Sequence, residues 1–167
     1  DVLGGTASTL GLLMAASGVG AVGGALYLAS RTSVVGLGRH MALGTLTFGL
    51  SLAVFALSTN LAWSLAVQVV LGAGFMIALA ATNTVIQTLV PEDLRGRVMA
   101  FYAMAFLGMT PLGSLAAGAA AERVGTPVTI LVGGLVCAAA GAWFLRALPG
   151  LGAIVRPIYV ERGILTM

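Results

Sequence analysis

Five long apolar stretches, separated by short segments that carry nearly all of the charge, constrain this chain more than any other feature. Each reaches or approaches the roughly 20 residues that an α-helix needs to cross about 30 Å of hydrocarbon. Strands are disfavoured, because hydrophobic alternation is absent and lipid offers no partner to an open sheet edge. The sequence therefore predicts an all-α, polytopic membrane protein, with a helix bundle over residues 1–148 and a cytoplasmic tail over residues 149–167. The expected spans cover about residues 2–29, 41–57, 62–90, 98–121 and 128–148.

The composition argues against several classes of function. Charged residues make up 8% of the chain, whereas a soluble domain carries about 25%, so the expected partner is the lipid bilayer. The net charge is +3, but the basic residues form no stripe with interleaved aromatic residues. No nucleic-acid partner is therefore expected. No nucleophile–base pair, phosphate-cradling loop or cofactor fingerprint is present, so neither an enzyme nor a cofactor is expected. With one histidine, His40, and one cysteine, Cys137, no metal site is expected.

The arginines predict the orientation of the spans. Seven of the eight lie at the end of, or after, the first, third or fifth span, and those three regions fall on one side of the membrane. The other side holds Arg123. An excess of arginine in short loops marks the cytoplasmic side, so the N-terminal end of the chain is expected outside and its C-terminus inside. A start outside the membrane without a signal peptide indicates at least one further helix before Asp1.

A small set of neutral polar residues lies inside the expected spans. Asn83 and Gln87 are four residues apart on the third span and share a helix face, and Gln68 falls roughly on the same face. Because polar side chains are costly in lipid, this stripe is expected to line a substrate cavity. Interhelical hydrogen bonding is the alternative role. The predicted cavity residues are Gln68, Asn83, Gln87, Thr110 and Ser114.

Charged residues in two cytoplasmic segments are candidates for a gate. Charge pairs there can close in one conformation and break in another, which biases a two-state equilibrium. The alternative is that they only fix the topology and begin a helix, with Asp93 as its N-terminal cap. The predicted gating residues are Arg31, Arg39, Glu92, Asp93, Arg95 and Arg97.

Proline and glycine predict where the helices bend and where they approach each other. Pro111, between Gly108 and Gly113, is expected to kink the fourth span, either as a bending point for transport or as a static feature of packing. Two small faces on the first span are expected to allow close helix contact. They consist of Gly20 and Gly24, and of Gly4, Gly11 and Gly18.

Two adjacent segments, Asn83–Gln87 and Val90–Ala100, resemble the major facilitator superfamily, above all in the run Pro-Glu-Asp-Leu-Arg-Gly-Arg. More narrowly, they are similar to the bacterial branch of enterobactin-exporter-like proteins, and the likeness continues through residues 106–114, 118–122 and 156–165. The resemblance implies that the chain is the last five of twelve helices, most of the C-terminal half of the bundle. It also implies a proton-coupled exporter of siderophores, drugs or other amphipathic small molecules. Such an exporter works by alternating access in the bacterial inner membrane, together with the missing N-terminal helices.

The loop of residues 31–39 departs from the family's pattern. The family pairs an aspartate with arginines there, whereas this loop keeps its glycines and arginines and has no acidic residue. No ionisable side chain lies deep within any span, so the proton carrier of such an exporter is expected in the missing half. The alternative function is a small, non-catalytic membrane scaffold or assembly subunit, which needs no helix before Asp1.

Overall fold

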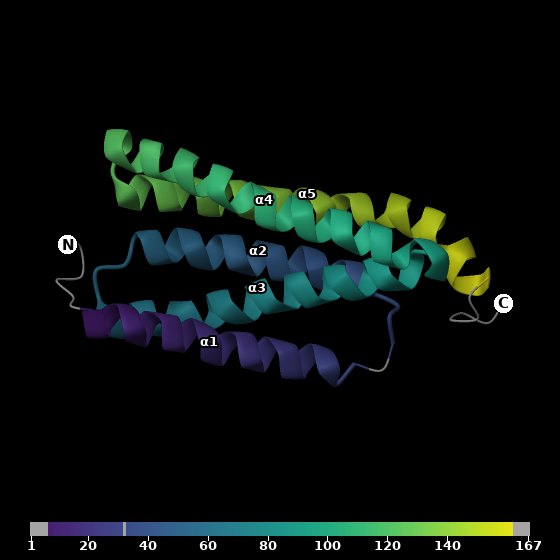
Figure 1. Cartoon of the computed structure of the whole chain (residues 1–167). Coiled ribbons are helices and arrows are strands. Elements are labelled where there is room, and N and C mark those ends of the chain that lie inside the picture. Colours follow the sequence, from purple (N-terminus) through teal and green to yellow (C-terminus); the bar gives the residue numbers. More distant parts are fainter. Residues whose placement is uncertain (1–6, 32, 162–167) are drawn as a thin grey trace.

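The structure, a computed structural model, describes residues 7–31 and 33–161 (Figure 1). Within these residues there is no strand, and each of the helices holds a stretch long and apolar enough to cross a membrane. The helices are α1 (Ala7–Ala29), α2 (Leu37–Ala56), α3 (Leu61–Leu89), α4 (Glu92–Val124) and α5 (Thr126–Glu161). The predicted all-α, polytopic membrane fold is confirmed.

Three of the helices extend beyond the predicted spans. α2 begins at Leu37 rather than Met41, and α4 begins at Glu92, directly after Pro91. The prediction that the last helix closes at Leu148 is wrong, because α5 continues through Pro149. A proline removes one backbone hydrogen bond and clashes with the preceding turn, but the helix on either side keeps its own bonds. The membrane-length segment of α5 is Thr126–Ala153. The division into bundle and cytoplasmic tail stays a prediction, and residues 162–167 of that tail lie outside the described residues.

Short, well-defined connections set the helix ends. The α2–α3 connection ends at Asn60, whose side chain accepts hydrogen bonds from the backbone nitrogens of Ala62 at 2.9 Å and Trp63 at 3.3 Å. Such an N-terminal cap satisfies backbone donors that have no partner within the helix. Gly36 before α2 and Gly125 before α5 have φ values of 86° and 85°, which a residue with a side chain rarely adopts.

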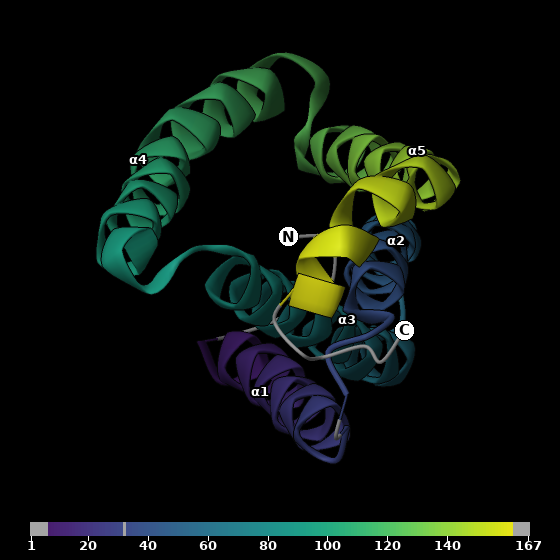
Figure 2. The same cartoon turned by 90° about the vertical axis from the view of Figure 1, so that its right-hand side faces the viewer.

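Four helices form a close-packed row, in the spatial order α1, α3, α2 and α5 (Figure 2). Neighbours in this row are in extensive contact, so that α3 separates α1 from α2. α4 differs from them, because it contacts α5 over part of its length and meets α3 only briefly. None of the described residues of α4 is buried. The row is therefore the core of the described structure, and α4 stands beside it.

Glycines bring the backbones of the row together. A Cβ atom on Gly24 would lie 2.7 Å from the carbonyl oxygen of Ala73 on α3, and one on Gly20 would overlap the backbone of Val69. The small face of Gly20 and Gly24 is thus confirmed as a helix contact. Gly11 and Gly18 have nothing within 4 Å, so the second predicted face has no neighbour in the described structure. Its other member, Gly4, lies outside the described residues.

The two contacts of α2 are built in the same way. On the α3 side, a Cβ atom on Gly44 would lie 2.7 Å from the backbone nitrogen of Ala78. On the α5 side, one on Gly134 would lie 2.6 Å from the backbone nitrogen of Ala53. Within lipid, close approach of this kind replaces the hydrophobic effect as the source of attraction between helices.

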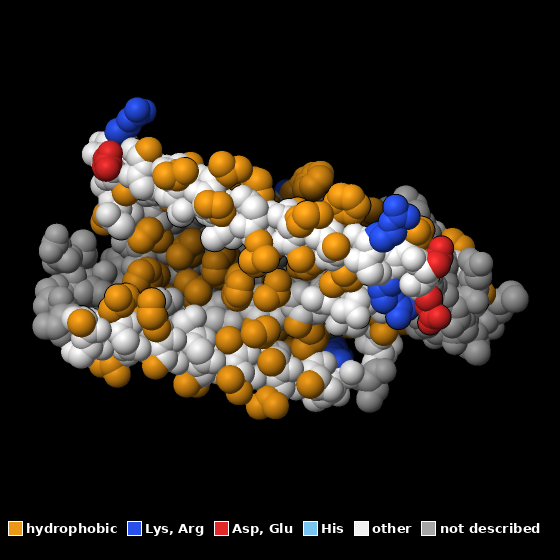
Figure 3. All heavy atoms as spheres, in the orientation of Figure 1, with side chains coloured by type: hydrophobic (Ala, Val, Ile, Leu, Met, Phe, Trp, Pro, Cys, Tyr) orange, Lys and Arg blue, Asp and Glu red, His pale blue; other side chains and the backbone are white. Residues whose placement is uncertain are grey.

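The charged side chains gather toward the two ends of the molecule (Figure 3). The α1–α2 connection, the α3–α4 connection and the end of α5 lie at one end, and the other two connections lie at the opposite end (Figure 1). Arg31, Arg39, Arg95 and Arg97 belong to the first of these, here named the arginine-rich end. The alternation agrees with helices that cross a membrane in turn. That this end faces the cytoplasm stays a prediction.

Candidate functional site

The face of the molecule between α4 and α1 is hollowed, and hydrophobic side chains line the hollow (Figure 3). α4, which borders the hollow, carries large side chains that are more than half exposed in the described structure. They include Phe101, Met104, Leu107, Met109, Leu112 and Leu115. An exposed helix of this composition is stable only against lipid or another apolar surface. The hollow is therefore the part of the structure most suited to an apolar or amphipathic molecule.

Asn83 and Gln87, one turn apart on α3, are joined by a hydrogen bond from the Gln87 amide nitrogen to the Asn83 amide oxygen. The pair still offers amide N–H donors on Asn83 and a carbonyl acceptor on Gln87. Exchanging oxygen and nitrogen in both amides leaves the same kinds of free group. The pair can therefore bind a neutral molecule that carries both a donor and an acceptor.

Gln68 lies apart from this pair. It is fifteen residues before Asn83 on the same helix, which corresponds to about 22 Å along the axis. Its amide oxygen is buried and has no hydrogen-bond partner in the described structure. Gln87 is two residues from the end of α3 and close to the arginine-rich end. The structure thus brings together Asn83 and Gln87, and it places Gln68 in the opposite half of the helix.

The two polar residues predicted on α4 are exposed, and both bond to their own helix. The Thr110 hydroxyl donates to the carbonyl oxygen of Phe106 at 3.1 Å, and the Ser114 hydroxyl donates to that of Pro111 at 2.9 Å. Each hydroxyl has used its donor, so it meets another molecule only as an acceptor. α4 continues without interruption through Pro111, and Gly108 and Gly113 have open space around them. The predicted kink stays a prediction.

The charged residues at the start of α4 form a weak pair and no cap. Glu92 lies 4.0 Å from the Arg95 guanidinium, and its side chain is 89% exposed, so the pair contributes little to stability. Asp93 lies in the first turn, where its charge favours the helix dipole. The prediction that Asp93 caps the helix is wrong, because Pro91 occupies the cap position and no side chain bonds there. The Arg95 Nε atom is buried without a hydrogen-bond partner in the described residues, and Arg97 is exposed.

The α1–α2 connection contains a cluster that sequence reasoning missed. Arg31 lies beside His40, with its Nη2 atom 2.8 Å from the imidazole Nε2, and Tyr27 contacts the same nitrogen. Arg39 is exposed in the first turn of α2. No role was assigned to His40 from the sequence. The only available signal was the spacing of Tyr27 and Arg31 on one face of a helix end, which does not show where a later histidine lies.

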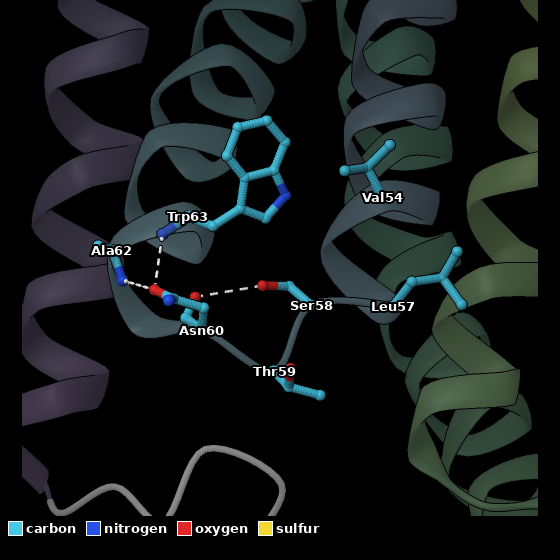
Figure 4. Close-up of a pocket in the computed structure, with 7 residues that line it drawn as sticks. All are labelled: Val54, Leu57, Ser58, Thr59, Asn60, Ala62 and Trp63. Atoms are coloured by element: carbon cyan, nitrogen blue, oxygen red, sulfur yellow. Dashed lines mark hydrogen bonds between the residues drawn. The ribbon is translucent and has the colours of Figure 1, made fainter.

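A shallow pocket of about 630 Å³ lies at the opposite end of the molecule, at the α2–α3 connection (Figure 4). It is open, and the Trp63 ring on its wall is 58% exposed. Ser58 and Ser64 are hydrogen-bonded at 2.8 Å and buried nearby. Exposed tryptophans are common where a helix enters the membrane surface, and this one agrees with such a position. None of the predicted site residues lines the pocket.

The described residues contain no group of three or more histidine, cysteine, aspartate or glutamate side chains that could hold a metal. Membrane-length helices beside an apolar hollow define a polytopic membrane protein.

Comparison with known families identifies the group within this class. The family described as transmembrane secretion effector, MFS_3, matches residues 1–154, and the chain belongs to this family of major-facilitator-type membrane transporters. No curated protein and no solved structure matches the chain. The resemblance to the superfamily is thus confirmed, whereas the enterobactin-exporter-like branch and the twelve-helix context stay predictions. Transporters of this family are generally not enzymes.

Proposed function

We propose that this chain is most of the C-terminal half of a secondary-active exporter in the bacterial inner membrane. Its cargo is an amphipathic small molecule such as a siderophore or a drug, and its arginine-rich end faces the cytoplasm. Membership of the transmembrane secretion effector family supports the transport activity. The excess of arginine at one end supports the orientation.

One observation carries the proposal: the apolar hollow beside α4, a helix without a single buried residue among those described. A complete bundle buries such a helix partly against other helices and leaves a cavity at the interface between its halves. We therefore assign the missing contacts of α4 to N-terminal helices of the same transporter. Rocking of the two halves against each other would then open the cavity to each side of the membrane in turn.

Within that cavity, neutral groups bind the cargo. Asn83 and Gln87 supply donors and acceptors near the arginine-rich end, and Gln68 supplies a buried amide in the other half of α3. Thr110 and Ser114 add acceptors from α4. α3 has no ionisable side chain, so proton coupling would use a group outside it. Arg31, Arg39 and the charged start of α4 would close the cytoplasmic mouth.

The test is export by the whole transporter that contains this chain, measured as efflux of a neutral fluorescent drug from energised cells. Asn83→Ala and Gln87→Ala each remove one side of the amide pair and are expected to lower efflux by roughly tenfold at most, the worth of one hydrogen bond. Membrane abundance should not change, since both residues are partly or fully exposed.

Thr84→Ala is the matched control, because Thr84 is an exposed residue of the same turn whose hydroxyl donates to the Ala80 carbonyl oxygen of its own helix. Normal export by both amide variants would remove the pair from the cavity. Abolition of the proton gradient should stop efflux, and efflux that continues without it would contradict secondary-active transport.

A scaffold or assembly subunit is the second candidate, and the same exposed face of α4 favours it, since a partner protein would cover that face equally well. The two functions differ in what they require. A scaffold variant with an altered amide pair should assemble and act normally, whereas the exporter should lose efflux.

A further inference from the structure

Two side chains and one backbone carbonyl contact the imidazole ring of His40 at the arginine-rich end. The ring's Nδ1 atom lies 3.1 Å from the carbonyl oxygen of Gly36. Its Nε2 atom lies 2.8 Å from Nη2 of Arg31 and 3.1 Å from the hydroxyl of Tyr27. Tyr27 is in the last turn of α1 and Arg31 lies two residues beyond its end, whereas His40 is in the first turn of α2. Since α3 separates the two helices elsewhere, this cluster is a direct tie between α1 and α2.

The neighbours of the ring fix its tautomer. A carbonyl oxygen only accepts hydrogen bonds, so Nδ1 must carry a hydrogen and donate it to Gly36. A guanidinium only donates, so Nε2 must be unprotonated and accept from Arg31. The Tyr27 hydroxyl, which can donate or accept, then donates to the same nitrogen. The contact with Arg31 therefore exists only while His40 is neutral.

A proton on Nε2 changes these roles. The ring becomes positively charged, and an N–H group faces the Arg31 guanidinium, which has no acceptor to offer and the same charge. Tyr27 can reverse its role and accept from the new N–H, and the bond to Gly36 is unaffected. Protonation of Nε2 therefore breaks its contact with Arg31 and leaves Tyr27 as its hydrogen-bond partner. We infer that the Arg31–His40 contact is a pH-sensitive latch, which opens when the compartment at the arginine-rich end becomes acidic.

The surroundings contain no described carboxylate that would offset the second charge. The neighbouring residue on α2 is Arg39, and α3, which packs against α2, has no ionisable side chain. The described charged side chains of α5 are Arg146 and Arg156, both exposed. The described carboxylates, Glu92, Asp93 and Glu122, are all on α4, and the ion pair that they make is Glu92 with Arg95.

Opening of the latch has a local structural consequence. The Arg31 guanidinium carbon lies 5.8 Å from the centre of the Tyr27 ring, a second contact that does not depend on the proton. Arg31 therefore keeps its attachment to α1 and loses its attachment to α2. The α1–α2 connection then has one tie fewer across it, and its backbone gains freedom. The latch itself requires no cargo, and through Arg31 it would act on the cytoplasmic mouth of the proposed exporter.

The first test is nuclear magnetic resonance of the whole chain in lipid nanodiscs, with isotope-labelled histidine. His40 is the single histidine, so every ring-nitrogen signal belongs to it. At about pH 8, above the range in which histidines usually titrate, we expect a protonated Nδ1 and an unprotonated Nε2. Detection of the opposite tautomer at that pH would overturn the inference, because Nε2 would then be unable to accept from Arg31.

The second test follows the connection itself. A spin label on Val35→Cys, an exposed position within the connection, is attached in a Cys137→Ala background. Between about pH 8 and pH 5, the ratio of mobile to immobile label is expected to rise roughly tenfold, which corresponds to about 1.4 kcal/mol. His40→Gln keeps an acceptor but takes up no proton, so its label mobility should not depend on pH.

Arg31→Gln separates charge from hydrogen bonding, because its amide still donates to Nε2 without a positive charge. Because that amide can also turn its oxygen toward a protonated Nε2, we expect the label to remain immobile across the same pH range. A pH response that persists in His40→Gln would overturn the latch. A response in Arg31→Gln identical to that of the parent would do the same, since the guanidinium would then have no part in it.

Discussion

The mean hydropathy of α4 falls within the range of the helices in the close-packed row, yet α4 packs very differently. The membrane-length segment of α4 has a mean hydropathy of 1.5 and no buried residue, whereas that of α2 has a mean hydropathy of 1.2 and 28% of its residues buried. Hydropathy therefore does not decide which helices pack. Lipid tails are as apolar as leucine, so helices associate where their backbones approach closely. In the row, Gly20, Gly24, Gly44 and Gly134 face a neighbouring backbone, whereas Gly96, Gly108, Gly113 and Gly118 of α4 face open space.

This difference is expected to be largest when a side chain is added to a glycine of the row. In Gly20→Leu the new Cβ atom overlaps the backbone of Val69 and forces α1 from α3, whereas in Gly18→Leu the new Cβ atom has nothing within 4 Å. We expect the first variant to lose roughly 3 kcal/mol of stability and the second to change by less than about 0.5 kcal/mol. Thermal unfolding of both variants in the same detergent gives the comparison. Equal unfolding temperatures would contradict the described contact between α1 and α3.

Truncation of leucine tests the same contrast from the opposite direction. Leu13 on α1 is 8% exposed and Leu115 on α4 is 71% exposed. Leu13→Ala leaves a cavity in the row and is expected to cost about 2 to 3 kcal/mol. Leu115→Ala removes a methylene surface that faces outward and is expected to cost less than about 0.5 kcal/mol. Denaturant unfolding of the reconstituted chain measures both. If Leu115→Ala proved the more costly, α4 would have a neighbour within the chain.

A smaller effect is expected at the helix cap of α3, which belongs to the row. Asn60→Ala removes the acceptor for the backbone nitrogens of Ala62 and Trp63 and should cost about 1 kcal/mol. Thr59→Ala, at the exposed neighbouring position, is the control and should have no measurable effect. Hydrogen exchange at those two nitrogens reports the change directly. Unaltered exchange in the Asn60 variant would mean that the cap does not stabilise the start of α3. The first turn of α3 would then be no more stable than that of α4, which has no side-chain cap.

The smallest effect is expected at Tyr159, beyond the membrane-length segment of α5. Burial raises the pKa of this phenol above its ordinary value of 10.0. The folded chain then holds the proton to higher pH than the unfolded chain, so stability present below about pH 10 is lost as the pH rises through the folded pKa. Tyr159→Phe should remove this alkaline loss. Unfolding temperatures of parent and variant between about pH 9 and pH 11 measure it, and parallel curves would show that the phenol is solvated.

The existence and kind of the helices were predictable, because length and hydropathy are properties of each segment alone. The end of α5 was not. Pro149 was interpreted as a stop, but a single proline removes only one hydrogen bond and the residues after it kept the helical conformation. The row was predictable in part, since Gly20 and Gly24 form a contact that Gly11 and Gly18 do not. Spacing identifies a small face but not the helix opposite it.

In the candidate site, too, contacts within one helix were predictable from the sequence, whereas contacts between elements were not. The Asn83–Gln87 bond follows from a separation of four residues on one helix. Gln68 was placed roughly on the same face by the same counting, which ignores the distance along the axis. The His40 cluster depends on how the α1–α2 connection turns at Gly36, and no periodicity within either helix records that turn.

The spatial order of the row has a consequence for how the chain is made. α1 and α2 are synthesised before α3, yet neither has the other as its neighbour, because α3 lies between them. α2 also has the lowest mean hydropathy of the membrane-length segments, 1.2. We therefore expect α2 to stay at the insertion machinery, or to insert only weakly into lipid, until α3 is synthesised and Gly74 can pack against Gly44. Its other side is covered only after nearly the whole of α5 has left the ribosome, so the centre of the molecule is completed last.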